Sequence, residues 1–268
     1  MKYALNNARN CLRIFLREAD VKELWVPYEL CSVVFKAARR EAVLLKFYHI
    51  DDNFMPAQDF SPSDYILYPN YFGICDNIAN FLATKYPNLI YDATQSFFAE
   101  PLGIATIYSA RKFFPVTDGG ILFTEMNLEM NFPKESEVEN FSTDPFNFDY
   151  ENFLKNELRF NRSDEIKLIS DKSRLRLSKI NEKEEKERRK ENFAKLHKFF
   201  KGINQLNIPT ETNAPMVYPL KTSLPVAEKL VEAGVFLIKY DYMKEIIPIP
   251  LEMAGTLPAI TKLFANII

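Results

Sequence analysis

The sequence predicts an α/β protein in which a mostly parallel, doubly wound sheet forms a large domain and a smaller α/β domain follows at the C-terminus. Short apolar runs recur through about the first 125 residues, and stretches with helical periodicity separate the early runs. A second, shorter alternation of the same kind follows residue 208. Strands that alternate with helices of about ten residues form parallel sheets, which bind ligands beyond the carboxyl ends of their strands.

The expected strands of the large domain are the apolar runs Tyr3–Leu5, Leu24–Val26, Leu44–Ile50, Tyr65–Tyr68, Leu89–Tyr91, Ile104–Tyr108 and Ile121–Phe123. The expected helices carry apolar residues three and four positions apart, and they are Ala8–Glu18, Tyr28–Arg40 and Ile78–Tyr86. Together these elements place the large domain within residues 1–150.

The middle of the chain changes character. Asn127–Asn152 has little periodicity, so we expect an irregular connection at a subunit contact or over the site. Two long helices are expected over Phe153–Phe200. Within them, Asn181–Asn192 carries both charge signs, which favours a solvated helix face with i,i+4 ion pairs over a basic partner-binding patch.

The last part of the predicted second region, residues 151–268, has its own strand and helix signals. Pro215–Pro219 and Val235–Ile238 are the expected strands around a helix over Leu224–Ala233. Gly234 fits the position that follows a helix C-terminus. Ile246–Pro250 contains prolines at alternate positions, which is typical of an edge strand.

Composition narrows the class of protein. The 268 residues are 47% hydrophobic and 26% charged, with a formal net charge of -2, which is ordinary for a globular protein and unlike a general nucleic-acid binder. No apolar run approaches the roughly 18 residues that span a bilayer, and the N-terminus lacks the apolar core of a signal peptide. We therefore expect a cytoplasmic protein without nucleic-acid or membrane partners.

Metal and disulfide sites are not expected. The three cysteines Cys11, Cys31 and Cys75 are widely spaced, and the only histidines are His49 and His197. An odd number of cysteines without a C-x-x-C pair argues against both structural zinc and a disulfide framework. These residues are expected to pack in the core or to face solvent.

Two segments carry the candidate chemistry. Asp92 and Gln95 follow the strand at Leu89–Tyr91, while Ser109 and Lys112 follow the strand at Ile104–Tyr108. An acid, an amide, a hydroxyl and an amine would converge at one end of the sheet. This set suits a pyridine-ring cofactor with a phosphate tail, attached through a lysine Schiff base.

Lys112 is the candidate nucleophile. It lies next to aromatic residues just after a strand, where desolvation would lower its pKa; the alternative is an ordinary surface lysine. Gly119-Gly120 follows in a chain that has only seven glycines. A glycine pair marks backbone that turns tightly or approaches another group closely. For Asp92, the alternative to a pyridinium partner is a helix N-cap.

The candidate phosphate site combines Ser109 with the turn before the first helix. Amides at the helix start, from Ala8 onward, favour an anion, and Arg9 could add a bidentate contact. The alternative is that Asn6 or Asn7 is an ordinary N-cap. Neither a G-x-G-x-x-G motif nor a P-loop motif is present, so dinucleotide and P-loop sites are excluded.

These motifs resemble the DegT/StrS-type nucleotide-sugar aminotransferases, which are fold-type I pyridoxal phosphate (PLP) enzymes. The family's Asp-x-x-Gln is matched by Asp92 and Gln95, and its lysine before a Gly-Gly pair is matched by Lys112. Ser109 matches the phosphate-binding serine with altered spacing, and Ala8–Leu12 loosely matches the phosphate-binding helix start. The resemblance is firmest over residues 3–125 and implies an aspartate-aminotransferase-like large domain that binds the cofactor.

The resemblance implies a role for each matched residue. Lys112 would form the Schiff base and then move the proton of the transamination, Asp92 would stabilise the pyridinium, and Gln95 would orient the ring. Ser109, Arg9 and the backbone at Ala8 would bind the phosphate. The amino donor would be an amino acid, with glutamate favoured, and the site would lie in a homodimer.

Three departures from the family concern the surroundings of the site. The chain begins almost at the phosphate-binding element, so the large domain is expected to be N-terminally shortened. Ala8-Arg9 replaces the usual Gly-Thr at the helix start. Cys31 stands near the position of a stacking aromatic, for which Tyr28 is a candidate substitute.

The sequence thus predicts a PLP-dependent aminotransferase that acts on a nucleotide-linked keto sugar. Two alternatives remain open at this stage. One is a degenerate family member that keeps the fold, with or without cofactor binding, but no transaminase activity. The other is a cofactor-free binding or scaffold protein. The sequence specifies neither the sugar nor the aminated carbon.

Overall fold

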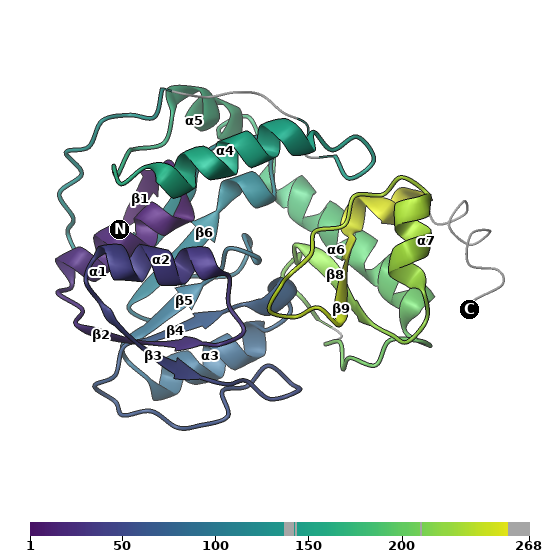
Figure 1. The fold of residues 1–268 in the computed structure, drawn as a ribbon, viewed down its shortest axis with the longest axis horizontal. Coiled ribbons are helices and arrows are strands. Elements are labelled where there is room, and N and C mark those ends of the chain that lie inside the picture. The colour runs from purple at the N-terminus through teal and green to yellow at the C-terminus, as the bar shows by residue number, and fades with distance from the viewer. Residues whose placement is uncertain (137–141, 143, 210, 257–268) are drawn as a thin grey trace.

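A computed structural model describes residues 1–136, 142, 144–209 and 211–256, and its centre is a seven-stranded sheet (Figure 1). The strands are β1 (Lys2–Leu5), β2 (Glu23–Pro27), β3 (Leu44–Tyr48), β4 (Ile66–Pro69), β5 (Leu89–Asp92), β6 (Ala105–Ser109) and β7 (Gly120–Thr124). Their order across the sheet is β1-β7-β6-β5-β4-β2-β3. All pairings are parallel except those of β7, which is antiparallel to both neighbours. The predicted mostly parallel sheet is confirmed.

Helices cover both faces of this sheet, as a doubly wound fold requires. Helices α1 (Ala8–Glu18) and α2 (Ser32–Arg40) pack on one face, and α3 (Asp76–Lys85) packs on the other (Figure 1). Strand β5 shows the alternation that makes this possible. Ile90 joins the core beneath α1 and α2, whereas Leu89 and Tyr91 join the core that includes α3.

The start of α2 corrects the predicted helix at Tyr28–Arg40. The amide of Tyr28 donates to the Tyr48 carbonyl at 2.9 Å, so the sheet hydrogen bonding continues one residue beyond β2, and residues 28–30 then form a bend. Helix α2 begins only at Ser32, after Cys31 in an extended conformation. Sheet hydrogen bonding therefore overrides the helical periodicity of these first residues.

Between Phe153 and Phe200 the structure has three helices where two were predicted, namely α4 (Tyr150–Arg162), α5 (Asp171–Leu177) and α6 (Glu182–Phe200). The extra break is an extended segment in which Leu168 forms bridges with Leu5 and Lys134. Ser170 then caps α5, because its side chain accepts from the Ser173 amide. These are tertiary contacts, which helical periodicity does not encode.

A smaller unit follows α6. Strands β8 (Val217–Lys221) and β9 (Ile246–Pro250) form an antiparallel pair, and α7 (Val226–Glu232) follows β8 (Figure 1). The predicted strand at Val235–Ile238 is wrong. The Phe236 amide donates to the Pro145 carbonyl at 2.9 Å, and its ring stacks on Phe148 at 4.1 Å between centroids. This segment therefore binds the chain before α4 instead of a strand.

The connection predicted at Asn127–Asn152 is largely irregular in its described part, although α4 begins at Tyr150. Residues 137–141 and 143 of that range lie outside the described residues. Helices α4 and α5 hydrogen-bond to the loop between β6 and β7, through Asn156 with Thr117 and through Ser170 with Asp118. The division of the chain at residue 150 stays a prediction.

The described residues contain no helix that is long and apolar enough to cross a membrane. Within the same residues, no group of three or more His, Cys, Asp or Glu side chains has the arrangement of a metal site. Cys11 and Cys75 are buried free thiols, while Cys31 is exposed.

Candidate active site

The candidate nucleophile, Lys112, lies at the carboxyl end of the sheet beside the end of β5. Lys112 Nζ donates to Thr94 Oγ1 at 3.2 Å, and the Thr94 amide donates to Asp92 Oδ1 at 3.0 Å. No helix follows Asp92, which rules out the alternative of a helix N-cap. Thr94 thus links the amine to the carboxylate, and the structure brings together two residues that are 20 positions apart.

The amine of Lys112 is accessible to solvent but surrounded by protein. Desolvation lowers the pKa of Lys112, while the nearby Asp92 carboxylate opposes this shift. A lowered pKa increases the fraction of neutral amine, which is the nucleophilic form. The predicted direction of the pKa shift therefore agrees with the structure.

Gln95 is held by residues that come from two other parts of the chain. Its Oε1 accepts from the Phe72 amide at 3.1 Å and from the Tyr240 hydroxyl at 3.4 Å. Its side chain also hydrogen-bonds to Tyr242, whose pKa is raised first by burial and then by the negative charges nearby, including that of Asp92. Tyr240 and Tyr242 were missed by the sequence analysis, because their segment follows the wrongly predicted strand.

The glycine pair secures the turn before α1. The Gly119 amide donates to the Asn6 carbonyl at 2.7 Å, and Gly119 has φ +131°, which favours glycine. A Cβ on Gly120 would lie only 2.3 Å from the Asn7 carbonyl carbon and 2.5 Å from the Ala8 nitrogen. The prediction of a close backbone approach is confirmed, and the group approached is the start of α1.

The start of α1 shows the N-cap that was the alternative to the predicted anion site, and the anion site itself stays a prediction. Asn7 caps the helix, since its side chain accepts from the Asn10 amide at 2.9 Å. The amides of Ala8 and Arg9 precede the first helical hydrogen bond, which runs from Cys11 to Asn7. Ser109 is 2% exposed and pairs with Gly120 across β6 and β7, so it lies close to this turn.

A carboxylate that was not predicted lies beside these groups. Glu157 of α4 forms ion pairs with Arg9 through one oxygen and with Arg111 through the other. Burial raises the pKa of Glu157, but the two guanidinium groups outweigh burial and bring this pKa to about 2. Arg9, which was predicted to contact phosphate, thus already has an anionic partner. The sequence offered no signal for Glu157, which lies 148 positions from Arg9.

The aromatic substitute proposed for Cys31 does not have that role in this structure. The Tyr28 ring stacks on Phe47 at 4.8 Å and on His49 at 4.4 Å between centroids, and it is 52% exposed. Cys31 itself is exposed and interacts electrostatically with Lys112.

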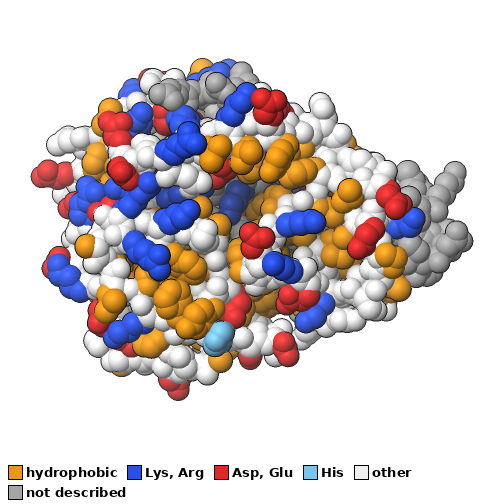
Figure 2. Space-filling view, viewed as in Figure 1, with side chains coloured by type: hydrophobic (Ala, Val, Ile, Leu, Met, Phe, Trp, Pro, Cys, Tyr) orange, Lys and Arg blue, Asp and Glu red, His pale blue; other side chains and the backbone are white. Residues whose placement is uncertain are grey.

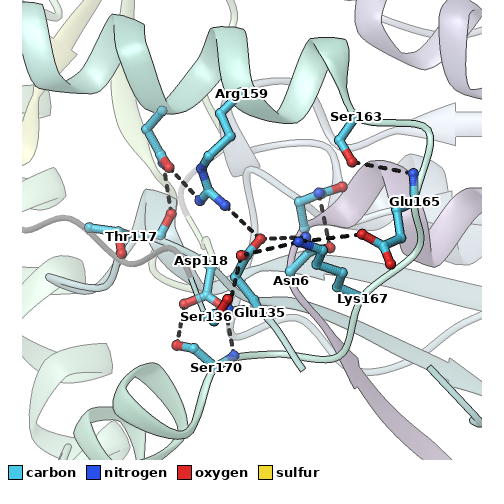
Figure 3. A network of polar contacts seen from close by, with 12 residues as sticks. Asn6, Thr117, Asp118, Glu135, Ser136, Arg159, Ser163, Glu165, Lys167 and Ser170 are labelled. Carbon is cyan, nitrogen blue, oxygen red and sulfur yellow. Dashed lines mark hydrogen bonds and ion pairs between the residues drawn. The ribbon is translucent and has the colours of Figure 1, made fainter. Parts of the chain in front are cut away.

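A buried polar network supports the turn from behind (Figure 3). Glu135 is almost fully buried; it accepts from Asn6 Nδ2 at 3.0 Å and pairs with Arg159 at 2.6 Å and with Lys167 at 3.8 Å. Glu135 and the residues around it line a cavity of about 80 Å³; the lining residues are Asn6, Asn7, Asn10, Glu135, Arg159, Phe160, Ser163, Glu165 and Lys167. Through Glu135, the irregular connection and α4 fix the position of the first turn.

Arg189 departs from the solvated helix face that was predicted for Asn181–Asn192. This residue is 4% exposed, pairs with Glu185 at 2.9 Å and lies over the Phe113 ring at 4.8 Å. Its guanidinium thus joins α6 to the residue that follows Lys112. The other part of the prediction, i,i+4 pairing along the helix, is confirmed by the pair with Glu185.

Figure 2 shows basic side chains at and around a recess between the large sheet and the C-terminal unit. A separate groove of about 770 Å³ is lined by Asp76, Asn77, Asn80, Lys190, Phe193, Ala194, His197, Lys198, Lys201, Pro209, Glu211, Thr212 and Asn213. That groove contains none of the residues proposed from the sequence.

Comparisons with known proteins define the fold. No family model matches the chain, and no curated protein sequence matches it. Among solved structures, Spr1654 from Streptococcus pneumoniae, assigned as a sugar aminotransferase and solved in its PLP form, is 15% identical with a TM-score of 0.65. That match covers 100% of this chain and 88% of the other.

Two further structures give the same result. A DegT DnrJ EryC1 StrS aminotransferase from Brucella abortus is 12% identical with a TM-score of 0.61, over 97% of this chain and 85% of the other. The sugar aminotransferase CalS13 from Micromonospora echinospora is 14% identical with a TM-score of 0.58, over 96% and 87%. The chain therefore has the fold of these aminotransferases along nearly its whole length, as predicted.

Proposed function

We propose that this protein is a PLP-dependent aminotransferase that acts on a nucleotide-linked keto sugar. The observation that carries the proposal is the Lys112–Thr94–Asp92 chain of contacts at the carboxyl ends of β5 and β6. It lies in a fold shared with sugar aminotransferases, two of which match over almost the whole chain. Ligands in such sheets bind at this edge.

The described residues fit the cofactor's chemical groups. When bound, PLP supplies an aldehyde that forms a Schiff base with a lysine and a ring that accepts electrons from the substrate carbon. Lys112 Nζ provides the amine and afterwards holds or moves the proton. Asp92 provides a carboxylate for the ring nitrogen, and Gln95, fixed by Phe72 and Tyr240, orients the ring.

The phosphate half has suitable donors. Arg9 Nη1 and Arg111 Nε are buried and lack a hydrogen-bond partner among the described atoms. The amides of Ala8 and Arg9 and the nearby Ser109 add uncharged donors. Unpartnered buried donors are costly, so an anion bound here would satisfy groups that the protein itself leaves unsatisfied.

The substrate and the partner extend the proposal beyond the site. The proposed amino donor is an amino acid such as glutamate, and the acceptor is a keto sugar linked to a nucleotide. The protein would act as a homodimer. Two of the aminotransferases that share its fold, Spr1654 and CalS13, are sugar aminotransferases by name, which supports the sugar class.

A spectroscopic titration tests the proposal. Purified protein mixed with PLP should gain the visible absorbance band of the protein-bound cofactor, and glutamate should bleach that band. Lys112→Ala should not form the band, and Lys112→Arg, which keeps the positive charge, should not form it either. Absence of the band in the wild type would contradict the proposal. A band that no amino acid bleaches would instead show a degenerate, inactive protein.

A further inference from the structure

The anion half of the candidate site, formed by Arg9, Arg111 and the start of α1, already contains a carboxylate. Arg9 Nη2 pairs with Glu157 Oε2, and Arg111 Nη1 pairs with Glu157 Oε1, so each guanidinium holds one oxygen. The three side chains are 12% to 18% exposed. The two guanidinium groups and the carboxylate together carry a net charge of about +1. Without Glu157, a phosphate dianion bound here would instead face a charge of +2.

Protonation does not remove this carboxylate near neutral pH. Because its pKa is about 2, Glu157 stays ionised, and the charges of Arg9 and Arg111 stabilise the ionised form. Glu157 also interacts electrostatically with Lys112 and raises the pKa of its amine. Only a movement of the side chain or of its helix would free the two arginines.

Helix α4 is held firmly in place around Glu157. Asn156 Nδ2 donates to the Thr117 carbonyl at 2.9 Å, and Arg159 pairs with the buried Glu135 at 2.6 Å (Figure 3). Phe160 is 4% exposed, and the guanidinium carbons of Arg111 and Arg159 lie over its ring at 5.1 and 4.4 Å from the centroid. The position of Glu157 between the arginines is therefore built into the fold.

We propose that Glu157 is an internal anionic ligand of the phosphate site, which competes with phosphate for Arg9 and Arg111 and thereby sets the affinity for phosphorylated ligands. The inference rests on the proposed function for the identity of the ligand, but its physical content concerns only the anion site. It assigns a specificity role to a residue outside the motifs that the chain shares with aminotransferases.

A purely structural ion pair makes the opposite prediction. If Glu157 only positions the two arginines, its loss would disorder them and weaken phosphate binding. If Glu157 competes, its loss would release two buried guanidinium groups and strengthen phosphate binding. The sign of the change in affinity therefore separates the two roles.

The test uses Glu157→Gln, which keeps the side-chain shape and removes the charge. Calorimetric titration with inorganic phosphate measures the anion site alone, and parallel titrations use PLP and pyridoxal. We expect Glu157→Gln to bind phosphate and PLP at least about tenfold more tightly than the wild type, with pyridoxal unchanged. Glu151→Gln, on the exposed side of the same helix, is the matched control and should change none of the three.

Each outcome decides the inference. Unchanged or weaker phosphate binding by Glu157→Gln would overturn it, as would an equal gain for pyridoxal. If both proteins bind phosphate as expected but neither gains the PLP absorbance band, the inference stands and the proposed function fails. If Glu157→Gln does not fold, Glu157→Asp in the same titrations decides, because its shorter carboxylate should hold the arginines less well and give a smaller gain.

Discussion

The two halves of the candidate site differ in how the protein treats their charges. In the half expected to hold the ring, Lys112 contacts a neutral hydroxyl, and its pKa is lowered by desolvation. In the half expected to hold the phosphate, Arg9 and Arg111 are already paired with Glu157. In the first half the neutral form of the amine is favoured, whereas in the second half the positive charge of the arginines is partly neutralised.

The difference reflects which segments build each half. The ring half comes from the ends of two adjacent parallel strands, where backbone register alone brings Asp92 close to the segment that carries Lys112. The anion half also requires α4, whose position depends on buried polar contacts with distant residues. The two halves are therefore built by different segments, although Arg111 and Glu157 also act electrostatically on Lys112.

The largest expected effect separates the two halves directly. Lys112→Ala should abolish all covalent trapping of both PLP and pyridoxal by borohydride, because the only proposed amine is lost. Mass spectrometry of the trapped protein measures the attachment and its position. Arg9→Gln should reduce trapping of PLP but not that of pyridoxal. Equal trapping of PLP by wild type and Lys112→Ala would show that the ring half is misassigned.

The buried polar network around Glu135 should affect the stability of the protein more than its proposed reaction. Glu135→Ala removes the buried carboxylate that accepts from Asn6 and pairs with Arg159 and Lys167, and it should lower the free energy of unfolding by about 3 kcal/mol. Denaturant unfolding measures the change. Glu129→Ala, an exposed glutamate in the same connection, is the control and should change stability by less than about 0.5 kcal/mol.

Acid should destabilise the anion half through Glu157. Because the folded pKa of about 2 lies below the usual glutamate pKa of 4.5, the ionised carboxylate stabilises the protein above about pH 4.5, and this contribution is lost as the pH falls towards 2. It is on the order of 3 kcal/mol. Unfolding followed from pH 6 to pH 2 should show this loss in the wild type, and Glu157→Gln should lack it. Parallel curves for the two proteins would rule out the contribution.

Crowding at the glycine pair should give a smaller effect. Gly120→Ala places a Cβ 2.3 Å from the Asn7 backbone and should cost about 2 kcal/mol of stability through the forced displacement of the turn. Phosphate affinity should fall in the same variant. Gly202→Ala is a matched control, because a Cβ there meets nothing within 4 Å. Equal melting temperatures for the two variants would contradict the proposed close approach.

The helix cap should give the smallest effect. Asn7→Ala removes the side-chain acceptor of the Asn10 amide and should lower stability by about 1 kcal/mol, whereas Asn7→Ser keeps an acceptor and should cost less. Thermal unfolding of both variants measures the difference. No difference between them would mean that Asn7 stabilises the turn mainly through its contact with Asn6.

The sequence allowed accurate prediction wherever local pattern determines structure. The seven strands of the large sheet and α1 were predicted close to their observed bounds, since their apolar periodicity reflects burial on one or two faces. The link from Lys112 through Thr94 to Asp92 followed from the rule for parallel strand ends, whereas the convergence of Gln95 on the same place stays a prediction. The predicted strand at Val235–Ile238 and the helix start at Tyr28 failed because contacts with distant segments decided them.

The sequence by itself determined the sheet and the order of its strands along the chain, because these depend on periodicity and on residues close in sequence. Only the tertiary structure decided that Tyr240 and Tyr242 reach Gln95 and that Glu157 lies between Arg9 and Arg111. These contacts join residues about 145 positions apart or, for Arg111 and Glu157, 46 apart. Charge pairing across such separations depends on how helices dock, and no local pattern in a single sequence records it.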